Sequence, residues 1–94
     1  MQTEVRDNPA QGRFELDVGG AVAFVAYKRL GGRVVLTHTE VPKALSGQGI
    51  GSRLVRGTLD ALRAQGAAVV PRCEFVAAYV ERHPEYRSLM ADGG

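Results

Sequence analysis

The chain has 94 residues, of which 45% are hydrophobic and 23% charged, and its formal net charge is +2. A chain of this size and composition forms one small globular domain, which we expect to span residues 1–94. The cations are scattered and only 6% of residues are aromatic, which argues against a nucleic-acid-binding surface of clustered cations and stacking rings.

Cysteine usage and hydropathy exclude further classes of protein. The single cysteine, Cys73, cannot form an internal disulfide and leaves too few ligands for most zinc sites, so we expect no bound metal. No apolar run approaches the roughly 18 residues of a membrane span, and the polar first residues do not resemble a secretory signal. We expect a cytoplasmic protein without nucleic-acid or membrane partners, acting as a monomer or small homo-oligomer.

The first half of the chain predicts an antiparallel meander. Residues 1–12 are polar, contain Asn8-Pro9, and are expected to be loosely ordered. Alternating or continuous apolar residues then indicate three strands, and Gly-Gly pairs between them suit tight hairpin turns. The strands are expected at residues 14–18, 21–30 and 33–41, with the turns at 19–20 and 31–32.

The second half predicts a helix, a strand and another helix, at residues 49–65, 67–72 and 75–82. Gly66 is expected to end the first helix in a left-handed conformation, and the short strand should return parallel to residues 33–41. Pro42 and Pro71 cannot donate to the sheet at the carboxyl ends of these neighbouring strands. We therefore expect the two strands to separate there and to leave a crevice for a ligand. The fold class is α/β (α+β).

A glycine-rich loop, Ser46-Gly47-Gln48-Gly49-Ile50-Gly51-Ser52, connects the third strand to the first helix. Glycines let the backbone turn sharply and let a ligand approach the N–H groups, and the helix N-terminus favours an anion. A dinucleotide fingerprint would need glycine in place of Ser52, and no glycine here is followed by the lysine of a Walker loop. The loop therefore predicts a phosphate-bearing ligand; the alternative is a simple connection between strand and helix.

Four blocks in this order resemble the GNAT acetyltransferase superfamily, in particular its minimal single-domain branch: residues 38–42, 47–52, 69–73 and 82–86. The resemblance implies a GNAT-like fold and an N-acetyltransferase that uses acetyl-coenzyme A (coenzyme A) as co-substrate. It further implies that residues 46–52 hold the pyrophosphate and that the backbone of Val41 pairs with the pantetheine arm. The family loop usually begins with Arg or Gln where this chain has Ser46, so one charge-assisted donor is missing.

Catalytic candidates follow from the same resemblance together with local chemistry. Cys73 stands where the acetyl thioester should end, at a helix N-terminus that favours a thiolate; the alternative is an inert buried thiol. His38 lies on the strand that would meet pantetheine, and alternation places Glu40 on the same face, so either could accept a proton from the amine. Structural roles are the alternatives for both. Tyr79 is expected to pack in the core, and His83 to cap the second helix.

The sequence is compatible with two functions from different classes. The first is an acetyl-coenzyme A-dependent N-acetyltransferase, acting by direct attack of the amine or through acetyl-Cys73. The second is a non-catalytic acyl-coenzyme A-binding module, which needs the loop but neither Cys73 nor His38. The minimal branch lacks elements with which larger enzymes grip the amine. The acceptor is therefore expected to be small, to be a protein side chain, or to bind where a second subunit completes the site.

Overall fold

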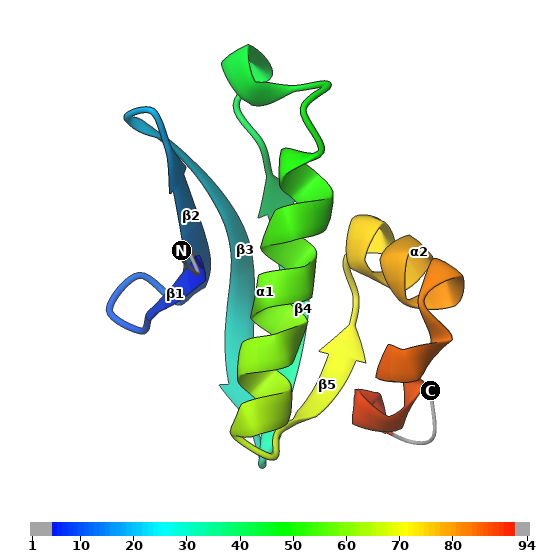
Figure 1. Ribbon diagram of the computed structural model, residues 1–94. Helices are drawn as coiled ribbons and strands as arrows, with labels where there is room; N and C mark the ends of the chain where they lie inside the picture. The colour runs from blue at the N-terminus through cyan, green and yellow to red at the C-terminus, as the bar shows by residue number, and fades with distance from the viewer. Residues whose placement is uncertain (1–4, 92–94) are drawn as a thin grey trace.

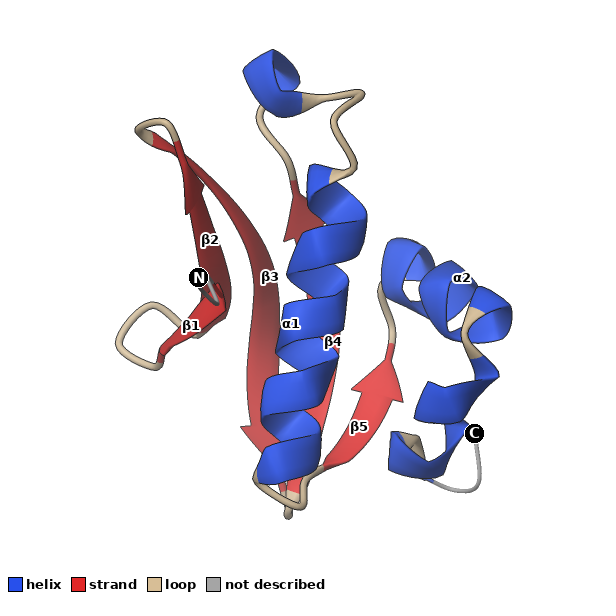
Figure 2. Ribbon diagram, in the orientation of Figure 1, coloured by secondary structure: helices blue, strands red, loops and turns tan. Residues whose placement is uncertain are grey.

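The computed structural model describes residues 5–91 as a five-stranded sheet with helices (Figure 1, Figure 2). The elements in chain order are β1 (Val5–Asn8), β2 (Arg13–Val18), β3 (Ala21–Leu30), β4 (Arg33–Glu40), η1 (Lys43–Leu45), α1 (Ile50–Ala64), β5 (Ala68–Pro71), α2 (Glu74–Arg82) and η2 (Pro84–Leu89). The strands lie in the sheet in chain order, antiparallel except for the parallel pair β4–β5. The predicted fold class is confirmed.

Strand β1 corrects the prediction that residues 1–12 are loosely ordered. Val5–Asn8 pairs antiparallel with β2, with Val5 opposite Leu16, whereas residues 1–4 lie outside the described part of the chain. The polar side chains that suggested a loose end make specific contacts instead. The Arg6 guanidinium forms an ion pair with Glu15 at 2.9 Å, and Glu15 is 3% exposed. The predicted meander therefore has four antiparallel strands rather than three.

Helix α1 lies across one face of the sheet and covers the main core (Figure 1). Its apolar stripe is fully buried, as its helical spacing predicted, against side chains of the central strands. The buried set includes Leu54, Val55, Leu59 and Leu62 on α1, and Phe14, Leu16, Val25 and Leu36 on the sheet. Gly66 follows the helix with φ of 70°, which confirms the left-handed end. Within residues 5–91, no helix has the length and apolarity needed to span a bilayer.

Strands β4 and β5 separate where the prolines predicted. Their pairing ends at Leu36–Pro71, while β4 continues to Glu40 against β3. One further hydrogen bond, from the Cys73 N–H to the Leu36 carbonyl at 2.9 Å, holds the chain beyond β5 close to β4. Beyond Leu36, residues 37–40 of β4 do not pair with β5.

The segment after α2 adds a structure that the sequence pattern did not predict. Residues 84–89 form the 3-10 segment η2, which packs against α1 and α2. Tyr86, Leu89 and Met90 are buried there, and the Tyr86 hydroxyl donates to Asp60 on α1 at 2.7 Å. This segment completes the core on the β5 side of the sheet.

Candidate functional site

The glycine-rich loop turns through two left-handed residues before α1 begins. Gly47 has φ of 80° and Gly49 has φ of 71°. A Cβ atom at either position would meet nothing within 4 Å. The backbone conformation, rather than crowding by other protein atoms, therefore makes glycine necessary at these two positions.

The N-terminus of α1 opens into this loop with its amide groups available. Gly49 is the N-cap and supplies no side chain, so no side chain caps the helix, and no acidic residue occupies the first turn. The first N–H groups of a helix have no partner within the helix, and its dipole places partial positive charge there. The loop and helix together form an anion cradle, a name that we use for residues 46–52.

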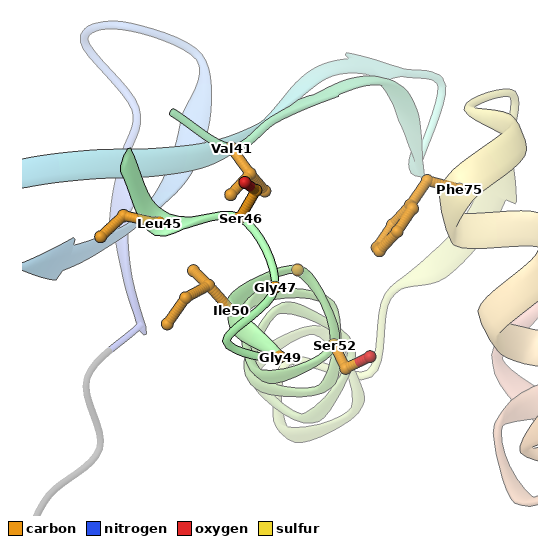
Figure 3. A pocket seen from close by; sticks show the side chains of 9 residues that line it. Val41, Leu45, Ser46, Gly47, Gly49, Ile50, Ser52 and Phe75 are labelled. Carbon is orange, nitrogen blue, oxygen red and sulfur yellow. The ribbon is translucent and has the colours of Figure 1, made fainter. Parts of the chain in front are cut away.

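A pocket of about 280 Å³ lies against this anion cradle (Figure 3). All predicted cofactor-binding residues except Gln48 line it; the side chain of Gln48 donates to the Ala44 carbonyl at 3.4 Å. Two further lining residues, Leu45 and Phe75, were missed. The lining residues are Val41, Leu45, Ser46, Gly47, Gly49, Ile50, Gly51, Ser52 and Phe75. Backbone N–H groups at one side of the pocket and apolar side chains elsewhere suit a ligand with a phosphate end and an apolar part.

Ser46 occupies the loop position at which the resemblance to the family leads one to expect Arg or Gln. Its hydroxyl donates to the Lys43 carbonyl at 2.9 Å and closes the η1 turn, although the residue also lines the pocket. The hydroxyl proton is therefore already used within the protein. In the structure, Ser46 shapes the loop, and the anion cradle relies on backbone groups of the loop and α1.

A β-bulge in β4 determines which face each candidate catalytic side chain occupies. Leu36 pairs with Tyr27 and His38 pairs with Ala26, which leaves Thr37 as the extra residue. Beyond the bulge, Thr39 is opposite the buried Val25 and so faces α1. Before the bulge the even-numbered residues of β4 face α1, whereas after it the odd-numbered residues do, so His38 faces away from α1.

His38 and Glu40 share the sheet face that points away from α1. The His38 Nε2 atom lies 2.6 Å from Oε1 of Glu40, which confirms that alternation places the two on one face. The His38 ring also meets Phe24 edge-on, with 6.3 Å between ring centroids. Both side chains of the pair are more than half exposed, at 58% and 55%. An imidazole bonded to an exposed carboxylate can accept a proton from an amine that approaches this face.

Cys73 occupies the N-cap position of α2, as predicted for a helix N-terminus, and is partly buried. Its Sγ atom lies 3.2 Å from Oγ1 of Thr39, on the α1 face of β4. Because His38 points to the other face, the structure does not pair the imidazole with the thiol. Across residues 5–91, no group of three or more His, Cys, Asp or Glu side chains is placed to hold a metal ion.

Tyr79 and His83 lie together in the packing between α2 and η2. Tyr79 is 5% exposed and stacks on the His83 ring with 4.0 Å between centroids. Burial raises the pKa of Tyr79 above its ordinary value. His83 follows the last turn of α2, where its N–H donates to the Val80 carbonyl at 3.1 Å. These contacts agree with the packing and helix-end roles expected from the sequence.

Comparison with known proteins assigns the family. The family model of the GCN5-related N-acetyl-transferases matches residues 13–89. The chain belongs to this family. Members of the family generally use acetyl-coenzyme A.

Similar proteins and structures extend this assignment. Protein NATD1 of Mus musculus and that of Homo sapiens are each 35% identical over 63 residues, which is 66% of this chain and 57% and 56% of theirs. The chain thus matches little more than half the length of these curated relatives. A GCN5-like protein from Staphylococcus aureus, solved by NMR, has a TM-score of 0.69 at 22% identity, covering 93% of this chain and 86% of that one. That likeness shows the fold.

Proposed function

We propose that this protein transfers an acetyl group from acetyl-coenzyme A to an amine, with the pyrophosphate held by the anion cradle. The observation that carries the proposal is the uncapped N-terminus of α1, which has no acidic residue in its first turn and opens onto the pocket. Without a capping side chain, the first N–H groups need an acceptor from outside the helix. The diphosphate of coenzyme A supplies acceptor oxygens and negative charge together.

The separation of β4 from β5 supports a path for the rest of the ligand. Pairing of the two strands stops at Leu36–Pro71, and Val41, at the end of β4, lines the pocket. The edge of β4 beyond Leu36 offers peptide groups that can hydrogen-bond the amides of a pantetheine arm, in the manner of an added strand. A ligand bound along this edge of β4 would run from the anion cradle toward Cys73.

Two chemical routes are open at the thioester end. In the first, the amine attacks the acetyl carbonyl directly, and the exposed His38–Glu40 pair accepts the proton that the amine releases. In the second, the Cys73 thiolate attacks the carbonyl, coenzyme A leaves as its thiol after taking up a proton, and the amine then attacks acetyl-Cys73. The position of the thiol is compatible with the second route, because the thiol lies on the α1 side of β4, as the anion cradle does.

A non-catalytic acyl-coenzyme A-binding module is the second candidate. One observation favours it: His38 and Cys73 point to opposite faces of β4 and do not form a nucleophile–base pair. A binding module requires only the anion cradle and the pocket.

The deciding experiment is a transfer assay in which product masses are measured directly. The protein is incubated with acetyl-coenzyme A and separately with polyamines, amino acids and lysine peptides. We expect an acetylated amine to form faster than without protein. If the amine attacks directly, His38→Gln should slow product formation; if the acetyl group passes through Cys73, Cys73→Ala should slow it. Binding of coenzyme A with no transfer to any amine class would favour the binding module instead.

A further inference from the structure

Phe75 presents an apolar surface to the pocket from the first turn of α2. Its side chain is 42% exposed, and it and Leu30 are the large hydrophobic residues that the described part of the chain leaves exposed. Unlike Leu30, which lies at the end of β3, Phe75 lines the pocket beside the anion cradle. Figure 3 shows its ring reaching from α2 toward the loop. A half-exposed ring gains most when a ligand covers its remaining surface.

Gly51 provides the space in which this ring sits. A Cβ atom at position 51 would lie 2.6 Å from Cζ and 3.2 Å from Cε2 of Phe75. Gly51 has no positive φ, so its backbone conformation would accept alanine. The third glycine of the loop therefore differs from Gly47 and Gly49, because contact with the ring, rather than a left-handed turn, explains it.

The ring also lies between the two ends of the proposed ligand path. Phe75 is only two residues beyond Cys73 in the chain, and Cys73 does not line the pocket. A ligand anchored at the first turn of α1 must pass the ring to bring its thioester to the thiol. The apolar part of such a ligand, its methyl and methylene groups, then covers the exposed side of the ring.

We propose that Phe75 grips the pantetheine arm of the acyl-coenzyme A and that Gly51 positions the ring for this contact. The inference rests on the proposed function and adds a specificity element to it. The anion cradle alone accepts any diphosphate, whereas the ring favours diphosphates that carry an apolar arm. Phe75 is therefore expected to separate coenzyme A from ADP, which has the diphosphate and lacks the arm.

The test is calorimetric titration of coenzyme A and of ADP into four proteins: wild type, Phe75→Ala, Gly51→Ala and the double variant. We expect Phe75→Ala to weaken coenzyme A about tenfold, the effect of leaving roughly half a phenyl ring uncovered, and to change ADP affinity less than twofold. Gly51→Ala displaces the ring and is expected to cause a similar loss. In the Phe75→Ala background the same Gly51→Ala change should have no further effect, because the displaced ring is gone.

Two further proteins serve as controls. Leu30→Ala removes the other exposed apolar side chain and should leave both affinities unchanged. Phe75→Leu keeps apolar bulk on α2 and should lose only about threefold for coenzyme A, which checks that any larger loss is not misfolding.

The outcomes separate this inference from the proposed function. If wild type binds coenzyme A but Phe75→Ala loses coenzyme A and ADP equally, the ring has a structural role and the inference is wrong. If Gly51→Ala still weakens coenzyme A in the Phe75→Ala background, Gly51 acts on the phosphates and not through the ring. If wild type binds neither ligand, both the proposed function and the inference are overturned.

Discussion

The Sγ atom of Cys73 lies 3.2 Å from the hydroxyl oxygen of Thr39, on the face of β4 that points toward α1. The bulge at Thr37 reverses the alternation of β4, so that Thr39 rather than His38 faces the thiol. Thr39 can donate its proton to a thiolate and so hold Sγ in one orientation. If the acetyl group passes through Cys73, Thr39 is the positioning residue for the attack.

Thr39→Val should therefore slow the formation of acetyl-Cys73. Valine keeps the shape of threonine but removes the hydroxyl, and the lost hydrogen bond corresponds to about a fivefold to tenfold lower rate. The rate is followed as the intact mass gains one acetyl group after mixing with acetyl-coenzyme A. Thr39→Ser retains the hydroxyl and should react near the wild-type rate, and Cys73→Ala should gain no acetyl group. Equal rates for Thr39→Val and wild type would rule out the positioning role.

Ser52→Glu should stabilise the protein while weakening its binding of coenzyme A. Substitutions at Gly47 or Gly49 strain left-handed backbone, whereas Ser52 is an exposed pocket residue in the first turn of α1. A carboxylate there interacts favourably with the helix dipole by about 0.3–1 kcal/mol, and it repels the diphosphate. We expect a free energy of unfolding in urea that is higher by about 0.3–1 kcal/mol, and coenzyme A binding that is at least fivefold weaker, about 1 kcal/mol.

Ser52→Gln is the matched control for this pair of effects, since it has similar size and no charge. It should change neither stability nor binding by more than about twofold in the equilibrium constant, about 0.4 kcal/mol. Binding that is equally strong for the Glu and Gln variants at low salt would show that the phosphate site lies elsewhere.

Ser46→Arg should tighten coenzyme A binding about twofold to fivefold, corresponding to about 0.5–1 kcal/mol for an exposed charge-assisted contact. The serine hydroxyl is bonded to the Lys43 carbonyl, so the substitution gives up one exposed hydrogen bond and adds a charged fork at the pocket. The gain should shrink as salt rises, because it is electrostatic. Dephospho-coenzyme A keeps the diphosphate and should gain as much. An affinity that stays the same at low salt would place Ser46 away from the diphosphate.

Gly57→Ala should destabilise the protein even though alanine is the better helix former. A Cβ atom at position 57 of α1 would lie 2.4 Å from Cγ2 of Val5 on β1. The clash should outweigh the gain of about 1 kcal/mol in helix propensity. The Cβ atom of Val5 would also lie too close, at 2.8 Å, so alanine at position 5 would not relieve the clash. In the Val5→Gly background both contacts are removed, so the same substitution should become stabilising. The free energy of unfolding in urea, measured for wild type, the two single variants and the double variant, checks this reversal. A destabilisation of the same size in both backgrounds would contradict the packing of β1 on α1.

Tyr86 should make the stability of the protein fall at alkaline pH. Burial of the ring, and then the hydrogen bond to Asp60, raise the pKa of Tyr86 from 10.0 to about 12. The folded state therefore favours the protonated phenol, and this stabilisation is complete below pH 10 and lost as the pH rises toward about 12. Tyr86→Phe should lose about 1 kcal/mol at pH 7 but show a smaller decrease between pH 9 and 11. Urea midpoints of wild type and Tyr86→Phe at pH 9 and pH 11 test this, and an equal decrease in the two proteins would contradict it.

Local signals in the sequence predicted most of the fold. Both glycines of each Gly-Gly turn have left-handed backbone, which tight hairpin turns favour. The apolar stripe predicted helix α1, and Gly66 predicted where it ends. Strand β1 and segment η2 could not be predicted in this way. Their stability comes from contacts distant in the sequence, such as Arg6 with Glu15 and Tyr86 with Asp60, and their own side chains look polar.

The candidate site was predictable where chemistry is carried by backbone conformation. Alternating glycines located the loop and its pocket, although Gly51 is explained by Phe75 rather than by a turn. The bulge at Thr37 left no signal in the sequence, so the partner of Cys73 could not be predicted. An aromatic residue two positions after Cys73 was the one available indication of the pocket's apolar wall.

The most direct test of the account is a titration of coenzyme A into ¹⁵N-labelled protein, with backbone amide shifts followed by NMR. Glycine amides at 47, 49 and 51 and the amides of Ile50 and Ser52 report on the anion cradle itself. We expect saturable shifts that are largest at these residues and at Phe75, and ADP should reproduce them at the loop but not at Phe75. Saturable binding whose largest shifts lie away from residues 46–52, or no shift at all, would contradict the central claim.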